Sequence, residues 1–196
     1  MRLKASPARL LHFSFISVVL GLLSCGPTSK TPASSPTARS ASALEQYLPL
    51  RHDTISQFEM VTDGGEPGMF VLEISRPRDN LAELRIAGHV QRLELTPTRI
   101  VHATGGTLLE EPLTVGHHFR GAFGEVTITD LHHSIDVPAG HFEQCLVTVE
   151  ESTTAPRRAT SVYCPEVGLV ALTVESFGAE AGLVENKLMQ HAPRYR

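Results

Sequence analysis

Cysteine thiols and histidine imidazoles are the side chains of this 196-residue sequence whose type and spacing could do chemistry. Cys25 ends an apolar run near the start, whereas Cys145 and Cys164 lie in the second half of the chain. A thiol can be acylated, can join a disulfide or can act as a nucleophile, and the redox compartment helps to decide among these roles. Ten histidines add imidazole nitrogens, which are ligands that zinc favours.

The segment that ends before Cys25 has the composition of a secretory signal peptide. Arg2, Lys4 and Arg9 give it a positive start, and an apolar run follows from Leu10 to Leu23. This run has about 14 residues, fewer than the roughly 20 that a membrane-spanning helix needs. A charged start, a short apolar segment and a small residue before the cleavage site are typical of export. We therefore predict a signal peptide over residues 1–24, with a buried N-terminal helix as the alternative.

The residues Leu22-Leu23-Ser24-Cys25 resemble the lipobox of bacterial lipoproteins. In that family the cysteine sulfur takes a diacylglyceryl group, a peptidase cuts before the cysteine, and the new amine is often acylated. The resemblance implies a diacylglycerol and an N-acyl lipid on Cys25, which would anchor the protein to a membrane. Each buried methylene contributes ~0.8 kcal/mol, so two or three acyl chains hold almost permanently. The alternative is ordinary signal cleavage that leaves Cys25 as a free thiol.

The residues behind Cys25 predict a linker and a destination. Gly26 differs from the aspartate that resembles an inner-membrane retention signal in enteric bacteria, which favours the outer membrane over the inner membrane. Apart from Cys25, Lys30 and Arg39, residues 25–43 are Gly, Pro, Ser, Thr or Ala. Such a segment cannot form an apolar core, so we predict a disordered linker there.

Residues 44–196 are enough for one domain with a sizeable core. Three of the 17 basic residues precede Cys25, so the chain from Cys25 onward has 14 against 21 acidic residues and a formal net charge of about −7. An acidic chain without a basic cluster is a poor ligand for nucleic acid. The chain also has no Trp and three Tyr, which disfavours stacking platforms for bases or sugars.

The pattern of residues 44–196 predicts an all-β domain. From Ile55 onward, short apolar-rich runs alternate with turn signals at intervals of about 8–12 residues, which is typical of antiparallel sheets. Phe70, Leu72 and Ile74 should share one face of such a strand. We expect a single meander of about ten strands that forms a curved sheet, a half-barrel or barrel, or a sandwich. A turn or two of helix is expected at 43–48. Residues 178–191 are ambiguous between helix and strand, and we assign their second half to a strand.

A hairpin register brings Cys145 and Cys164 together. If Glu151 lies opposite Arg158, two strands flank the "STTAP" turn and Cys145 falls opposite Cys164. Directly opposed strand residues have Cα atoms about 4.5–5.5 Å apart, within the range of a disulfide. Because export leads to an oxidising compartment, we predict a Cys145–Cys164 disulfide; the alternatives are two buried free thiols or a catalytic thiol.

Three further stretches resemble an uncharacterised family of bacterial secreted proteins and lipoproteins with β domains. They are "YLPL" at 47–50, "VPAGHFEQC" at 137–145 and "YCPEVGLV" at 163–170. The resemblance covers Tyr47 to about Phe177 and implies no assigned activity. The same stretches also suit turns and strand ends. Because Pro138 restricts φ and Gly140 allows positive φ, "PAG" predicts a three-residue hairpin loop with a bulge.

Neither the histidines nor the acidic pairs form a known catalytic or metal motif. The pairs His117-His118 and His132-His133 cannot chelate alone, because adjacent strand residues point to opposite faces; a site would need one of each pair together with His141. The sequence lacks the HExxH, GxSxG, GxGxxG and P-loop signatures. We interpret the adjacent Glu150 and Glu151 as solvated strand residues. We therefore predict no catalytic residue, no metal ligand and no cofactor besides the lipid on Cys25.

The leading hypothesis is a non-enzymatic envelope lipoprotein, anchored to the membrane at Cys25 and structural or protein-binding in role. Its partner would be an envelope protein that pairs with an exposed sheet edge. The alternative is a carrier that holds a lipid or another apolar ligand within the curved sheet. The second alternative is a metal-binding or hydrolytic envelope protein that uses the five histidines His117, His118, His132, His133 and His141.

Overall fold

The computed structural model describes residues 42–178 and 181–193, which begin with a short helix. Helix α1 (Ala43–Tyr47) starts at Ser42, whose hydroxyl accepts a hydrogen bond from the Glu45 N–H at 3.2 Å. This cap satisfies an N–H group that the first turn leaves unpaired. The last two residues of the predicted linker thus belong to the fold, and residues 1–41 lie outside the described part. No helix in the described ranges is long and apolar enough to span a membrane.

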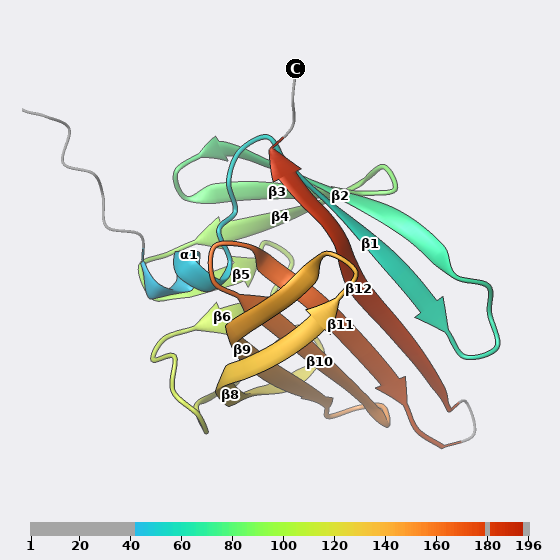
Figure 1. Ribbon diagram of the computed structural model, residues 1–196. Helices are drawn as coiled ribbons and strands as arrows, with labels where there is room; N and C mark the ends of the chain where they lie inside the picture. Colours follow the sequence, from blue (N-terminus) through green and yellow to red (C-terminus); the bar gives the residue numbers. More distant parts are fainter. Residues whose placement is uncertain (1–41, 179–180, 194–196) are drawn as a thin grey trace, which may run out of the picture. The chain divides into compact units, whose positions relative to one another are not determined.

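Twelve β-strands follow α1 in the described part of the chain, and they form one antiparallel sheet (Figure 1). In chain order they are β1 (Thr54–Thr62), β2 (Gly68–Arg78), β3 (Leu81–Ile86), β4 (His89–Leu95), β5 (Arg99–His102), β6 (Thr107–Glu110), β7 (His118–Arg120), β8 (Gly124–Val137), β9 (Gly140–Ser152), β10 (Arg157–Cys164), β11 (Gly168–Ser176) and β12 (Gly182–Pro193). The predicted all-β meander is confirmed, with two more strands than the ten expected.

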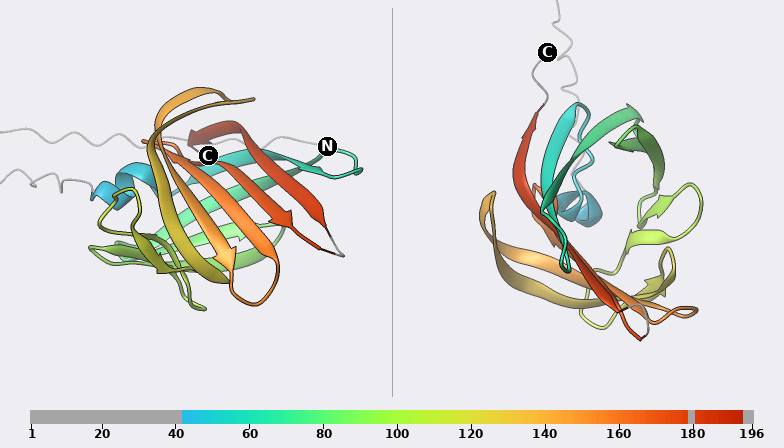
Figure 2. Two further views of the ribbon diagram at one scale, coloured as in Figure 1. Left: turned by 90° about the horizontal axis from the view of Figure 1, so that it is seen from below. Right: turned by 90° about the vertical axis from the view of Figure 1, so that its right-hand side faces the viewer.

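The order of the strands explains the shape of the sheet. Strands β1–β6 form one meander and β7–β12 form a second, and β1 pairs with β12 to join them. The two edges of the sheet are therefore β6 and β7, which are consecutive in the chain. Figure 2 shows the sheet curling around α1 until these edges approach each other. The result is a nearly closed barrel, one of the predicted shapes.

Alternating side chains give the sheet an apolar inner face. On β2, Phe70, Leu72 and Ile74 share the inner face as predicted, and Phe70 stacks on Phe58 of β1 at 5.1 Å between ring centroids. Glu73 of β2 lies opposite Arg85 of β3, on the other face of the sheet. Burying the apolar face stabilises the fold by roughly 25 cal/mol per Å² of apolar surface.

Three elements differ from the sequence-based expectation. Residues 124–137 form one long strand rather than two, because irregular pairing with β9 carries β8 past the bulges near Asp130 and His133. Strands β6 and β7 have four and three residues, too few for alternation to be visible in the sequence. The strand predicted in the second half of residues 178–191 is confirmed as β12, since pairing with both β1 and β11 outweighs the helix propensity of its residues.

The β8–β9 hairpin folds over the outer face of the sheet, in front of β10 and β11 in Figure 1. Val137 near its tip packs with Val162 and Val170, and the Ala139 N–H donates to the Leu188 carbonyl at 2.9 Å. The turn itself has two residues, since Val137 pairs directly with Gly140, rather than the three-residue loop suggested by the "PAG" stretch. The sheet is thus covered on both faces at β10 and β11.

A glycine contact brings the two edges of the sheet together. The β5–β6 turn contains Gly106, which has a φ of +90°. A Cβ atom on Gly106 would lie 2.5 Å from the Ala122 Cα in the β7–β8 turn. Because real Cβ atoms do not approach so closely, only glycine allows these two turns to touch.

Replacing Gly106 by alanine should therefore loosen the closure of the barrel. We expect Gly106→Ala to lower the free energy of unfolding by about 2 kcal/mol, from backbone strain and from overlap with Ala122. The matched control is Gly105→Ala, because Gly105 also has a positive φ of +104° but has open space around it. Urea unfolding should show a loss of about 1 kcal/mol for the control. Equal losses in the two variants would contradict a close contact between the turns.

Candidate functional site

Of the predicted site residues, Cys25 lies outside the described residues. Its lipidation therefore stays a prediction. The histidines and the two remaining cysteines all lie on described elements, and the structure shows which of them meet.

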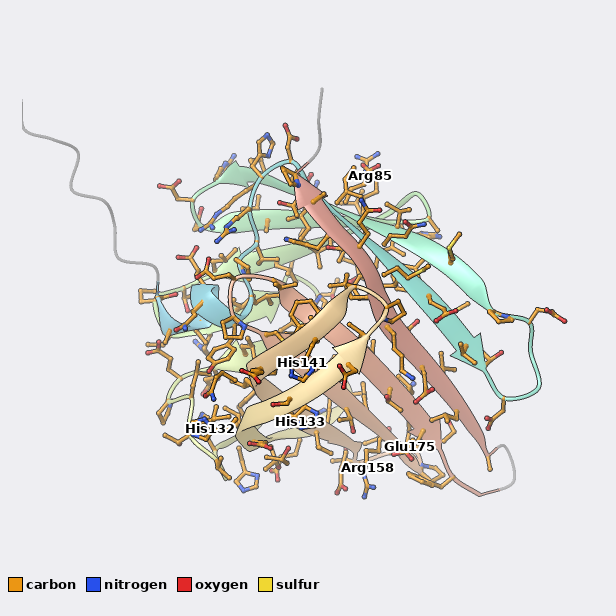
Figure 3. The ribbon with its side chains drawn as sticks, in the orientation of Figure 1. Arg85, His132, His133, His141, Arg158 and Glu175 are labelled. Atoms are coloured by element: carbon orange, nitrogen blue, oxygen red, sulfur yellow. A yellow bond between two sulfur atoms is a disulfide. The ribbon has the colours of Figure 1, made fainter. Side chains whose placement is uncertain are left out.

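Three of the five predicted histidines, His132, His133 and His141, lie on the β8–β9 hairpin (Figure 3). On the β8–β9 hairpin, the His132 ring lies 2.7 Å from the Gln144 amide oxygen, His133 lies 3.9 Å from Asp130, and His141 lies 2.8 Å from Asp136. The hydrogen bond and charge of Asp136 raise the pKa of His141. Each of these contacts joins two residues of the hairpin itself, so the three histidines have local partners.

The other predicted pair, His117 and His118, lies at β7. The His118 ring lies 2.9 Å from the Thr127 hydroxyl, and the His117 ring packs near Phe119 at 5.8 Å between centroids. Among residues 42–178 and 181–193, no three His, Cys, Asp or Glu side chains are placed to hold one metal ion. The structure does not bring the five histidines together, so the geometry gives no support to a shared metal site.

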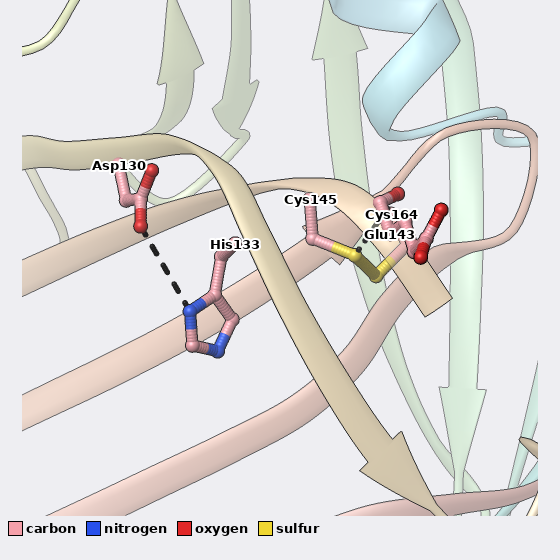
Figure 4. Close-up of a disulfide and its surroundings, with 5 residues drawn as sticks. All are labelled: Asp130, His133, Glu143, Cys145 and Cys164. Atoms are coloured by element: carbon pink, nitrogen blue, oxygen red, sulfur yellow. Dashed lines mark hydrogen bonds and ion pairs between the residues drawn. A yellow bond between two sulfur atoms is a disulfide. The ribbon is translucent and has the colours of Figure 1, made fainter. Parts of the chain in front are cut away.

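Cys145 and Cys164 form a disulfide between β9 and β10, with their Cα atoms 4.2 Å apart (Figure 4). The observed pairing places Arg158 opposite Glu151, which is the register that the sequence predicted. Both cysteines are buried, in an apolar cluster that contains Val137 of the outer hairpin and also Phe58 and Leu72 of the sheet. The disulfide therefore fastens the covered outer face and lies on the side of β10 opposite the interior.

The interior of the curved sheet contains a hollow of about 370 Å³. Its lining is mostly aliphatic and aromatic and comes from nearly every strand and from the segment after α1. The lining residues are Leu48, Pro49, Leu50, Ser56, Phe58, Phe70, Leu72, Ile74, Leu84, Ile86, Gln91, His102, Leu108, Ala122, Phe123, Glu150, Ala159, Ser161, Tyr163, Val167, Gly168, Leu169, Leu172, Val174 and Asn186. A volume of this size falls within the roughly 300–1,000 Å³ of typical small-molecule sites.

The segment after α1 closes one side of the hollow. Leu48, Pro49 and Leu50 line it, while α1 is fastened from outside by an ion pair between Glu45 and Arg76 at 2.6 Å. The Glu166 N–H also donates to the Gln46 carbonyl of α1 at 2.8 Å. The helix is thus a fixed part of the wall.

A second, open pocket of about 730 Å³ adjoins the hollow. It lies at the β4–β5 end of the barrel, and Gln91, His102 and Ala122 line both spaces. Its other lining residues are Val90, Arg92, Ala103, Thr104 and Gly105, so it is more polar than the hollow. We name this open pocket the vestibule, because it shares three lining residues with the hollow.

Glu150 is the one Asp, Glu, Lys or Arg that lines the hollow among the described residues. One carboxylate oxygen, Oε1, accepts hydrogen bonds from the N–H groups of Phe123 at 2.6 Å and Gly124 at 2.8 Å. Gly121 makes room for this arrangement, since a Cβ there would overlap the carboxylate. Glu150 thereby fixes the β7–β8 turn that forms part of the wall.

The prediction that Glu150 and Glu151 are both solvated was wrong for Glu150. Glu151 points outward and receives a hydrogen bond from Arg158 at 2.8 Å, whereas Glu150 points inward beside Ala159. The sequence held the signal, because adjacent residues of a strand point to opposite faces and one of the two had to face the interior.

Other polar groups of the lining are held by the protein itself. The Ser56 hydroxyl lies 2.9 Å from the His191 ring, and the Asn186 amide donates to the Leu172 carbonyl at 3.2 Å. Burial raises the pKa of Tyr163 to about 12, so its hydroxyl stays protonated. Burial also lowers the pKa of His102, against the opposing effect of Glu150, so its ring is neutral at pH 7. The hollow therefore offers a dry apolar surface, few polar groups and one carboxylate.

No protein-family profile matches this sequence, and no curated protein sequence is similar to it. Several solved structures are similar in fold, among them the following two. One is a "putative exported protein with YmcC-like fold" from Bacteroides fragilis, with a TM-score of 0.50 and 9% identity over 74% of this chain and 98% of that one. The other is a "putative lipoprotein" from Parabacteroides distasonis, with a TM-score of 0.49 and 10% identity over 74% of this chain and 98% of that one. At 9% identity, the first likeness shows a shared fold.

Proposed function

We propose that this protein is an exported envelope lipoprotein that carries an apolar ligand in the hollow of its curved sheet. The observation that carries the proposal is the apolar hollow of about 370 Å³, which adjoins an open vestibule. Its ligand is an acyl chain or an apolar group of similar size. Catalysis is no part of the proposal.

The physical reason is the unfavourable state of an empty apolar space. Apolar cavities stay dry, and they bind apolar molecules that fit them. Each methylene that leaves water for the hollow gains ~0.8 kcal/mol, so a chain of several methylenes binds through its length. The polar lining groups Ser56 and Asn186 are already hydrogen-bonded within the protein, so they do not demand a polar ligand.

The geometry favours a carrier over partner binding through a sheet edge. The edge strands β6 and β7 have four and three residues. Very short edge strands are one of the devices by which proteins prevent pairing with other chains. An envelope protein partner would therefore have to contact another surface.

Export and anchoring rest on the signal-like residues 1–24 and on the lipobox that ends at Cys25. The likeness in fold to a protein named as a putative exported protein supports the same compartment, and a disulfide at Cys145–Cys164 suits an oxidising one. The proposed location is the outer membrane, because Gly26 follows the cysteine. The proposal includes no nucleic-acid partner.

The anchor is tested by labelling bacteria that produce the protein with a radioactive fatty acid. The wild-type chain should incorporate the label and fractionate with membranes, and Cys25→Ala should do neither. Cys145→Ala is the matched control and should keep the label, since its thiol belongs to the folded part. Label on the Cys25→Ala variant, or none on the wild type, would contradict the anchor.

The carrier function is tested on residues 25–196 with Cys25→Ser, which removes the acyl chains that would compete for the hollow. Titration with a fluorescent fatty-acid analogue should give saturable binding at one site per chain, with a Kd in the micromolar range or below, about −8 kcal/mol or better. Unlabelled long-chain alcohol should displace the probe. Fluorescence that rises without saturation would mean nonspecific adsorption and would contradict a built site.

A further inference from the structure

The hollow is lined mainly by apolar side chains, whereas the vestibule is more polar. Together the two spaces fit an amphiphile, a molecule with an apolar tail and a polar head. The hollow takes the apolar tail, and Glu150 lies on its side toward the vestibule, since it accepts a hydrogen bond from the N–H of Phe123 beside Ala122, which lines both spaces. We propose that the ligand is a single-chain amphiphile with an ammonium head, and that Glu150 recognises this head. This inference rests on the proposed carrier function and adds the class of ligand.

The first step concerns charge. Among the described residues that line the hollow, Glu150 is the one Asp, Glu, Lys or Arg. Its Oε1 accepts hydrogen bonds from the N–H groups of Phe123 and Gly124, which fix its position. Its second oxygen, Oε2, accepts no hydrogen bond from the described residues. A fixed carboxylate with a free oxygen in an apolar surrounding attracts a cation more strongly than it would in water.

The second step concerns the cations that compete for Glu150. His102 lies near Glu150, but its ring is neutral at pH 7 because burial lowers its pKa. Arg92 in the vestibule donates to the Glu83 carboxylate at 3.1 Å on the neighbouring strand. Arg157 at the start of β10 lies over the Phe123 ring, 4.2 Å from its centroid. None of these three residues forms an ion pair with Glu150 within the described part of the chain, so a positive charge brought by the ligand completes the site.

The third step concerns the opposite, anionic head, which weakens binding through the chain without preventing it. An anionic head of the same chain length would place two negative charges in a space of low dielectric, which is unfavourable. An uncharged head would neither gain nor lose this interaction. The order of affinity predicted for equal chains is therefore ammonium, then alcohol, then carboxylate.

The test compares dodecylammonium, dodecanol and dodecanoate as competitors of the fluorescent probe, on residues 25–196 with Cys25→Ser at pH 7. Dodecylammonium should bind about tenfold more tightly than dodecanoate, with dodecanol between them. In Glu150→Gln this ratio should fall below about threefold, while dodecanol binds unchanged. The glutamine Oε1 can still accept from Phe123 and Gly124, so the β7–β8 turn is kept.

The matched control is Glu151→Gln, which removes one negative charge from the adjacent, outward-facing position. It should keep the tenfold preference, so that a change of net charge alone is excluded as the cause. If all three amphiphiles bind equally to the wild type, or if Glu150→Gln keeps the preference, the inference about the head is overturned and the carrier stands. If none of the three binds, the carrier function is overturned as well.

Discussion

Replacing Ser161 by phenylalanine is expected to weaken binding of the fluorescent fatty-acid analogue by about a hundredfold, or ~2.7 kcal/mol. Ser161 lies in the middle of β10 and lines the hollow between Ala159 and Tyr163. A benzyl group there would fill space that the acyl chain must occupy. The loss would be measured by titration of Ser161→Phe beside the parent chain.

The same substitution should leave the fold intact, because the new ring enters a space that is already empty. The free energy of unfolding should change by less than about 1.5 kcal/mol, as for tolerated core substitutions. Ser134→Phe is the matched control, since Ser134 is exposed on β8 and distant from the lining. Unchanged binding in Ser161→Phe would show that the probe binds somewhere other than the hollow.

Removal of the disulfide should produce the largest loss of stability. Replacing both Cys145 and Cys164 by alanine is expected to lower the free energy of unfolding by about 3 kcal/mol, because a cross-link over 19 residues restricts the unfolded chain. Binding of the probe should remain, since the disulfide packs under the outer hairpin and the hollow lies on the other face of β10. The loss of stability is measured by urea unfolding without reductant, and probe binding is measured by titration with the fluorescent probe.

Cys25→Ala provides the control for the loss of a thiol, because it leaves the disulfide in place. Its stability should equal that of the chain with Cys25→Ser. A loss below about 1 kcal/mol in the double variant would contradict a stabilising cross-link. A loss of probe binding together with stability would mean that the outer hairpin and the hollow are coupled.

The alternation of apolar and polar residues along the strands made the local structure predictable from the sequence. Phe70, Leu72 and Ile74 predicted the inner face of β2, and the opposed charges of Glu151 and Arg158 predicted the register of β9 and β10. Such patterns are local, so they need no knowledge of distant segments. The pairing of β1 with β12 joins residues more than 120 positions apart, and no local pattern encodes it.

The site itself was harder to predict, because it exists only when the sheet curls. The lining comes from segments between Leu48 and Asn186, and each contributes one or a few ordinary apolar side chains. The histidines attracted attention by their type, yet on the hairpin they pair singly with Gln144, Asp130 and Asp136. Glu150 was hidden among surface acids, although strand alternation required it to face inward.

The central claim is that the inside of this sheet holds an apolar ligand, and its most direct test is the mass of what the protein carries. Residues 25–196 with Cys25→Ser would be exported behind the cleavable signal peptide of a soluble exported protein, isolated without detergent and weighed intact by native mass spectrometry. The account predicts a population heavier than the bare chain by one amphiphile, which organic extraction releases and which Ser161→Phe lacks. A bare chain in both proteins, with no saturable uptake of added long-chain amphiphile, would contradict it.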